Sequence, residues 1–248
     1  LFGSAYKAAS DSLSPLFQRL SDGFKGSASK ISAFFGGEMK SYTIHFIRNA
    51  LTDEKLEGRY IGHTNVELSD EGKSQLRQMR EELVYPPVDA LFTSPLKRCT
   101  ETASILYPDN KPIVIDGIIE YNFGEFENKT AEQLEKYEEF PRWLAGEKGV
   151  KPPYGESNED FNKRVCDTFE KIAEGLMKTG TTSAAIITHG GVIMTILAAY
   201  GIPEYPMHEW ITPSGCGFTV KLNPSLWSRA KKFEVFSEFP YEREELPD

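Results

Sequence analysis

The sequence lacks the features that mark several large classes of protein. No apolar run in its 248 residues approaches the roughly 18 residues of a membrane-spanning helix. Its three cysteines, Cys99, Cys166 and Cys216, are odd in number and far apart. This pattern indicates neither a disulfide framework nor a zinc site, and it favours a reducing compartment, the cytoplasm. Basic residues are in deficit, 28 against 37 acidic ones, so we expect no nucleic-acid partner. Without an apolar run of spanning length, a membrane partner is not expected for the domain.

The composition is that of a globular domain with a further segment at its N-terminal side. Hydrophobic residues make up 40% of the chain and charged residues 26%, which is enough apolar material for a core. Residues 1–37 are rich in serine and glycine, and four basic side chains there outnumber two acidic ones. We therefore predict an appended arm over residues 1–37 and one domain over residues 38–248.

The arm carries bulky apolar residues at helical spacing, and four interpretations of it remain open. It is a tag or linker, or an amphipathic helix that packs on its own domain or on a second copy of the chain. Alternatively, it is a helix on a membrane surface, or a fused substrate or partner peptide. Unless it is a tag, we expect residues 1–37 to form any homo-oligomer or partner contact.

Strands alternate with helices along the predicted domain. Short apolar runs predict strands at 42–48, 89–93, 112–116, 183–188, 216–222 and 233–237. Helical spacing and capping residues predict helices at 69–83, 95–106, 157–178 and 190–200, with a mainly helical stretch at 130–146. The alternation predicts an α/β fold in three layers, α/β/α, around a mostly parallel sheet.

Charged side chains follow four of these strands at the carboxyl ends, where open α/β sheets gather their ligands. Arg48 ends the first strand, and Arg98 lies one turn into the helix after the second. Glu120 follows the third, and His189 follows the fourth at a helix start. Taken singly, each is more often a salt-bridge, capping or solvated residue. Together they predict an anion pocket, best suited to phosphate, with a carboxylate at its rim as candidate general acid.

Six segments, in order, carry a resemblance to one family: 46–52 (FIRNALT), 58–65 (GRYIGHTN), 68–72 (LSDEG), 94–103 (SPLKRCTETA), 120–126 (EYNFGEF) and 188–191 (THGG). Over about four-fifths of its length the chain resembles the histidine phosphatase superfamily, which has the phosphoglycerate mutase-like fold. Two of the segments, 46–52 and 94–103, look most like the α-ribazole phosphatase and small-phosphatase branch.

The resemblance implies a metal-independent phosphomonoesterase that acts through a phosphohistidine intermediate and needs no cofactor. It implies phosphate binding by Arg48, Arg98, His189, Gly190, Asn65 and Thr52. Catalytic roles fall on position 49, Glu120 and His189, with Glu120 protonating the leaving alkoxide and then activating water. Tyr121 and Arg59 are candidate substrate-binding residues, and Arg59 is equally well a surface arginine.

The sequence departs from the family at the nucleophile. Where the family has a histidine after the first-strand arginine, this chain has Asn49. A side-chain amide offers no comparable in-line nucleophile, although it can hydrogen-bond a phosphate oxygen. Two hypotheses compete: Asn49 is an engineered replacement in an active phosphatase, or the protein is a natural pseudophosphatase that binds phosphate esters without turnover. The first is favoured because Arg48, Arg98, Glu120 and His189 all match the family.

The segment expected to roof the pocket is a small helical cap at about 121–155, and it is short and acidic. Like charges disfavour a polyanionic substrate, so a phosphatase is favoured over a phosphoglycerate mutase. The expected partner is a small phosphorylated metabolite or a phosphopeptide. Aromatic residues of the cap either line a leaving-group pocket or, as favoured, pack the cap onto the sheet: Tyr121, Phe123, Phe126, Phe140 and Trp143.

Overall fold

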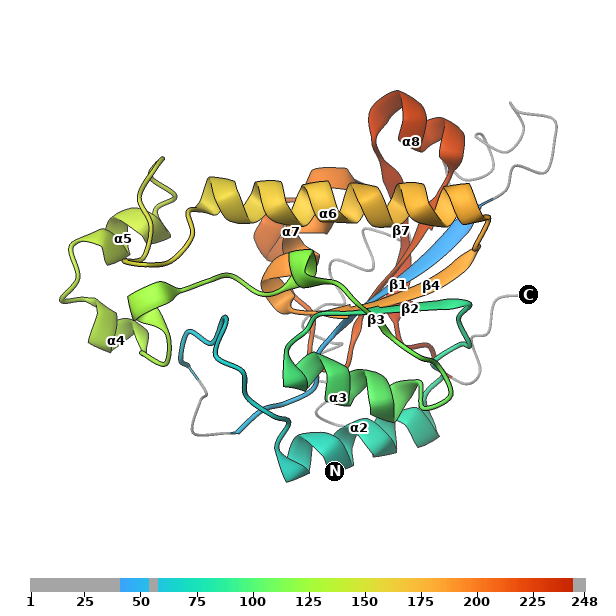
Figure 1. Cartoon of the computed structure of the whole chain (residues 1–248), viewed down its shortest axis with the longest axis horizontal. Coiled ribbons are helices and arrows are strands. Elements are labelled where there is room, and N and C mark those ends of the chain that lie inside the picture. The colour runs from blue at the N-terminus through green and yellow to red at the C-terminus, as the bar shows by residue number, and fades with distance from the viewer. Residues whose placement is uncertain (1–40, 54–57, 243–248) are drawn as a thin grey trace.

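The computed structural model describes residues 41–53 and 58–242, and the predicted arm lies outside these ranges. The described residues form a seven-stranded sheet in the order β3-β2-β4-β1-β6-β7-β5, with helices on both faces (Figure 1). The strands are β1 (Tyr42–Arg48), β2 (Ala90–Thr93), β3 (Ile113–Val114), β4 (Ser183–Thr188), β5 (Gly201–Ile202), β6 (Gly217–Leu222) and β7 (Phe233–Phe239). Only β6 pairs antiparallel with its neighbours β1 and β7. The predicted three-layer fold with a mostly parallel sheet is therefore confirmed.

The centre of the sheet is made by β1 and β4, which run parallel and end level with each other. Arg48 at the end of β1 lies opposite Thr188 at the end of β4. Ile44, Phe46 and Ile47 of β1 are fully buried. Both faces of these strands are covered, which explains why β1 and β4 read as continuous apolar runs rather than alternating patterns. The level ends place the residues after Arg48 and Thr188 side by side.

One face of the sheet is covered by α6 (Asn158–Thr179), α7 (Gly190–Tyr200) and the short α8 (Pro224–Ala230) (Figure 1). Helix α6 begins after Ser157, whose Oγ accepts the Asp160 N–H at 3.1 Å. It ends at Gly180, which has a φ of 72° and so adopts a conformation that glycine enters without strain. Buried side chains of α6 such as Phe169 pack on the sheet, with the Phe46 ring 5.6 Å away between centroids.

The opposite face carries α2 (Asp70–Glu82) and α3 (Lys97–Leu106) (Figure 1). Ser69 caps α2 as predicted, since its Oγ accepts the Gly72 N–H at 2.9 Å. Leu76 of α2 and Ala103 of α3 are buried in the same cluster as Ile47 of β1. This packing fixes the start of α3, and with it Arg98, against the end of the sheet.

The predicted cap at about 121–155 contains three short elements, the 3-10 helix Gly124–Phe126, α4 (Ala131–Leu134) and α5 (Glu139–Leu144), and another 3-10 helix, Asp116–Ile118, precedes it. Pro141 has no N–H to donate to the carbonyl four residues earlier, so a helix cannot run unbroken through 130–146. The cap aromatics pack on one another: Phe126 is fully buried and Trp143 Nε1 donates to the Tyr121 hydroxyl at 2.8 Å.

The shortest elements are the ones that sequence patterns do not predict. Strand β5 and the 3-10 helix Met207–Trp210 are too brief to show a period, and α8 was also not predicted. Strand β3 is shorter than the predicted 112–116. Among the helices of residues 41–53 and 58–242, none combines the length and apolar character needed to cross a membrane.

The buried His45 of β1 belongs to the core and lies on the α2/α3 face of the sheet. Its Nδ1 is 3.0 Å from Thr219 Oγ1, and its ring lies 4.7 Å from the Phe239 ring between centroids. Burial lowers the pKa of His45 to about 4, so the folded protein holds this imidazole neutral at pH 7.

We expect His45 to make the folded state less stable in acid. The unfolded chain protonates this imidazole below a pKa of about 6.5, whereas the folded chain does so only near 4. The free energy of unfolding therefore keeps its full value above about pH 6.5, and it falls by about 3 kcal/mol as the pH drops to 4. Urea unfolding of the chain and of His45→Phe at pH 7 and pH 4 checks this. An equal loss in both proteins would contradict it.

Candidate active site

A cavity of about 560 Å³ opens where β1 and β4 end. It is lined by Arg48, Asn49, Ala50, Leu51, Thr52, Asp53, Gly58, Arg59, Ile61, Ser69, Glu71, Arg98, Glu120, His189, Gly190 and Ser214. Residues from all four predicted strand ends thus meet in a single cavity, although they span more than half of the chain. Parallel strands with level ends bring them together.

Arg48 and Asn49 leave the end of β1 and enter the cavity side by side. The Arg48 N–H donates to Cys216 O at 2.8 Å, and its Nη1 donates to Thr212 O at 2.7 Å. The Asn49 N–H donates to Thr188 O at 2.9 Å, and its side-chain Nδ2 donates to Ala50 O at 2.9 Å. These bonds fix the amide so that Oδ1 faces the other side chains of the cavity.

Arg98 lies in the first turn of α3 and is almost completely buried. Its Nη1 donates to Thr64 O at 2.9 Å and its Nη2 to Gly62 O at 2.7 Å. Its Nε donates to His189 Nδ1 at 3.2 Å. Burial lowers the pKa of Arg98 and of Arg48, but arginine keeps its charge in proteins. The cavity therefore holds two fixed positive charges.

His189 is the residue directly before α7, and its largely buried side chain lines the cavity. Its Nε2 lies 2.8 Å from Ser94 Oγ. Its Nδ1 lies 3.2 Å from Arg98 Nε and 3.1 Å from Asn49 Oδ1, and it either accepts from the first or donates to the second. Burial lowers the pKa of His189 well below its usual range, and the charges of Arg98 and Arg48 lower it further. The imidazole is therefore neutral at pH 7.

Glu120 supplies the carboxylate of the cavity. Its Oε1 accepts the Tyr121 N–H at 2.9 Å and its Oε2 accepts the Gly191 N–H at 3.1 Å. Burial raises the pKa of Glu120, against the lowering effect of these N–H groups and of Arg98 and Arg48. A carboxyl group with a raised pKa keeps its proton to a higher pH than an exposed one, which suits a general acid.

Of the residues predicted only by resemblance, Thr52, Arg59 and Gly190 line the cavity. Arg59 is also bonded to the cap, because its Nη1 donates to Asn128 O at 2.6 Å. Asn65 and Tyr121 are not among the described residues that line the cavity. The Asn65 carboxamide oxygen instead accepts the Lys97 N–H at the start of α3.

Tyr121 likewise has a different environment from the one predicted. Its ring is buried among the cap aromatics, and its hydroxyl donates to Glu156 O at 2.7 Å. A side chain that is buried and already hydrogen-bonded in this way does not face a ligand in the cavity. The prediction of a substrate contact for Tyr121 is therefore not supported by its position.

The structure adds two polar residues to which sequence reasoning assigned no role. Ser94 follows β2 directly and contacts His189. Its place at the carboxyl end of a strand, which it shares with the other residues of the cavity, is therefore the signal that could have identified it. Glu127 accepts the N–H groups of Gly62, His63 and Thr64 at 3.1, 2.8 and 3.2 Å. It thereby fixes the loop whose carbonyl oxygens accept hydrogen bonds from the Arg98 guanidinium. Because its partners lie some 65 residues earlier, no local pattern reveals them.

Comparison with known proteins gives relatives named as phosphatases and relatives named as phosphoglycerate mutases. The chain is 27% identical over 158 residues to a putative phosphoserine phosphatase 2 of Hydrogenobacter thermophilus, covering 62% of this chain and 76% of that protein. It is 33% identical over 130 residues to phosphoserine phosphatase 1 of the same organism, covering 51% of this chain and 62% of that protein. A putative alpha-ribazole-5'-P phosphatase structure from Escherichia coli shares the fold, with a TM-score of 0.66 at 21% identity, covering 84% and 98% of the two chains.

A family model described as the histidine phosphatase superfamily (branch 1) matches residues 44–227, which include every residue of the predicted phosphate pocket. The match agrees with the phosphatase relatives, with the shared fold and with the positive cavity at the strand ends. The chain belongs to the histidine phosphatase superfamily.

Proposed function

We propose that the protein has the binding site of a metal-independent phosphomonoesterase in which Asn49 occupies the position of the nucleophilic histidine. In this proposal the chain binds phosphate monoesters and turns them over extremely slowly. The observation that carries it is the place of Asn49: its side chain lies in the cavity, beside Arg48 on the chain and in contact with His189. An amide there can bond a phosphate oxygen but cannot form a phosphoryl-enzyme.

The hydrogen bond from Asn49 to Ala50 O supports this assignment. Asparagine Nδ2 and histidine Nδ1 are both attached to Cγ, so an imidazole at position 49 would donate the same bond from Nδ1. Its Nε2 would then be unprotonated and would face the cavity as a nucleophile. The other histidine of β1, His45, cannot replace it, because His45 lies on the α2/α3 face and contacts Thr219 and Phe239.

The remaining residues supply the rest of the chemistry in this proposal. Arg48, Arg98 and the start of α7 would bind the nonbridging phosphate oxygens, whose negative charge spreads in the transition state. Glu120 would give its proton to the leaving oxygen and later take one from the attacking water. His189, neutral and buried, would donate a hydrogen bond to the phosphoryl group rather than carry a charge.

The proposed ligand is a small monoester. The cavity of about 560 Å³ exceeds the volume of a phosphate group alone, and its outer wall includes both apolar and charged side chains, among them Leu51, Ile61 and Arg59. The relatives named as phosphoserine phosphatases support a small phosphorylated metabolite as the substrate of the catalytically complete form.

Phosphate binding by the chain as it stands tests this proposal. We expect calorimetry to detect binding of inorganic phosphate and of O-phosphoserine, and we expect Arg48→Met to weaken it about 10- to 100-fold, since a charge-assisted hydrogen bond contributes about 1.5–3 kcal/mol. Arg77→Met, which changes an exposed arginine of α2, serves as the matched control. No binding of either ligand, or equal binding by the two variants, would refute the proposal.

A further inference from the structure

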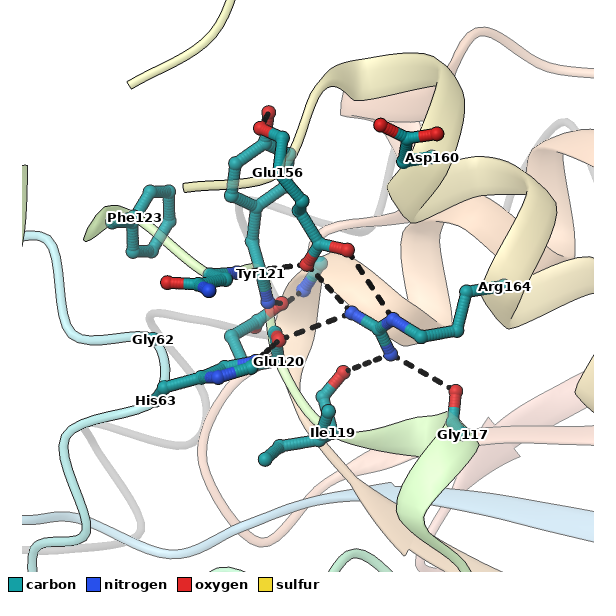
Figure 2. A network of polar contacts seen from close by, with 12 residues as sticks. Gly62, His63, Gly117, Ile119, Glu120, Tyr121, Phe123, Glu156, Asp160 and Arg164 are labelled. Carbon is teal, nitrogen blue, oxygen red and sulfur yellow. Dashed lines mark hydrogen bonds and ion pairs between the residues drawn. The ribbon is translucent and has the colours of Figure 1, made fainter. Parts of the chain in front are cut away.

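The segment that carries Glu120 depends on a side chain of another element for its shape. Residues 119–123 belong to no helix or strand, so their carbonyl groups find no partners in regular secondary structure. Three carbonyl oxygens in and just before this segment, those of Gly117, Ile119 and Glu120, accept hydrogen bonds from Arg164 of α6 (Figure 2). These hydrogen bonds give the carbonyl groups the partners that backbone acceptors need, and they tie the segment to α6.

Arg164 uses its whole guanidinium group in these contacts. Nη1 donates to Gly117 O at 3.0 Å and to Ile119 O at 2.9 Å. Nη2 donates to Glu120 O at 3.3 Å and to Glu156 Oε1 at 2.7 Å, and Nε donates to Glu156 Oε2 at 3.3 Å. All five N–H groups therefore have acceptors, an arrangement that the single ammonium of lysine cannot reproduce.

Glu156 holds the other side of the same segment. Its Oε1, besides pairing with Arg164, accepts the Asn122 N–H at 2.8 Å, and its backbone oxygen accepts the Tyr121 hydroxyl at 2.7 Å. Figure 2 shows Arg164 and Glu156 meeting at the start of α6, with the Glu120 segment against them. The ion pair thus forms hydrogen bonds with the backbone both before Glu120, at Ile119, and after it, at Asn122.

A second arginine–glutamate pair differs from the Arg164–Glu156 pair in its exposure to solvent. Arg142 and Glu147 of the cap form two hydrogen bonds of 2.6 and 2.9 Å, but their side chains are 54% and 49% exposed. The side chains of Arg164 and Glu156 are only 26% and 15% exposed. An exposed ion pair contributes little to stability, whereas the less exposed pair binds backbone atoms on either side of a residue of the cavity.

The position of the Glu120 carboxylate follows directly from the position of its backbone. Oε1 accepts the N–H of the next residue, Tyr121, and Oε2 accepts the N–H of Gly191 at the start of α7. There is little free space here, since a Cβ atom on Gly191 would lie 2.5 Å from Oε1. A shift of the 119–121 backbone by a fraction of an ångström would move the carboxylate away from the leaving oxygen.

We propose that Arg164, held in place by Glu156, is a positioning residue that orients the Glu120 carboxyl group for proton transfer to the leaving group. The inference rests on the proposed function, in which Glu120 is the general acid. Its consequence depends on the leaving group. An alkoxide must be protonated as the P–O bond breaks, whereas p-nitrophenolate is a weak base and leaves without a proton.

The test compares two substrates in the full chain with Asn49→His as background. We expect Arg164→Met to lower kcat/KM for glycerol 2-phosphate about 10- to 100-fold and for p-nitrophenyl phosphate less than about 3-fold. Because kcat/KM includes only steps up to release of the leaving group, later hydrolysis of the phosphoryl-enzyme does not enter it. Arg164→Lys restores part of the loss, because an ammonium replaces some of the donors.

Arg142→Met, the same substitution in the exposed ion pair, is the control and leaves both substrates unaffected. Should Arg164→Met fail to fold by circular dichroism, Glu156→Gln keeps the shape of its side chain and is expected to show the same substrate dependence with a smaller loss. Equal losses on both substrates, or no loss on either, would overturn the inference. Absence of p-nitrophenyl phosphate hydrolysis by Asn49→His alone would instead refute the proposed function.

Discussion

Replacing Asn49 by histidine is expected to give the protein phosphatase activity. The substitution returns an imidazole whose Nδ1 can donate to Ala50 O, where the Asn49 Nδ2 now donates at 2.9 Å. Nε2 is then free to attack a phosphorus atom held by Arg48 and Arg98. Removing a nucleophile from an otherwise complete site costs on the order of 10⁴- to 10⁶-fold in kcat, so we expect a gain of this size for p-nitrophenyl phosphate, measured by release of p-nitrophenolate.

Asn49→Ala is the matched control for this gain. It removes the amide and supplies no nucleophile, so it should stay as inactive as the original chain. His45 remains in both variants and is expected to contribute nothing, because it is buried in the core against Thr219 and Phe239 and does not line the cavity. A folded Asn49→His variant without activity above that of Asn49→Ala would contradict the assignment of position 49.

Replacing Glu120 by glutamine in the Asn49→His background is expected to have the second-largest effect. General acid catalysis contributes about 10²- to 10⁴-fold, so kcat/KM for glycerol 2-phosphate should fall by this amount. The value for p-nitrophenyl phosphate should fall far less, because its leaving group needs no proton. Glu125→Gln, a change of an exposed carboxylate in the cap, should alter neither. An equal fall on both substrates would argue that Glu120 binds the phosphate instead.

The pH dependence of the same variants gives an independent check on Glu120. Burial raises the pKa of its carboxyl group, and only the protonated form can act as an acid. In Asn49→His, kcat/KM for glycerol 2-phosphate should therefore fall as pH rises through this raised pKa. With Glu120→Gln the low remaining rate should lose that dependence. A profile with the same fall in both proteins would assign the titration to another group.

Much of the fold could be predicted because its central elements carry strong local signals. The strand at 42–48 matches β1 residue for residue, and the long helix predicted at 157–178 differs from α6 by one residue at each end. The apolar runs and the capping Ser157 specify these elements without help from the rest of the chain. By contrast, β5 and α8 are short, and the cap helix is interrupted between Leu134 and Glu139, so no period extends far enough to predict them.

The residues of the cavity could be predicted from their place in the sequence, directly after predicted strands. Arg48, Arg98, Glu120 and His189 all follow strands, and parallel strands bring their carboxyl ends to one edge of the sheet. What holds these residues in place was not predictable. Arg98 is anchored on the carbonyls of a loop 34 and 36 residues away, and Glu120 on an arginine 44 residues later. Hydrogen bonds to backbone atoms leave no pattern in the side-chain sequence.

The most direct test of the account is a search for a phosphoryl group covalently bound at position 49. The variant with both Asn49→His and Glu120→Gln should accept phosphoryl from p-nitrophenyl phosphate but hydrolyse the product slowly, because the base for water is missing. We predict an intact mass higher by one phosphoryl group, located by peptide sequencing at position 49 and lost in acid. A phosphoryl group on another residue, or none while p-nitrophenolate is released, would contradict it.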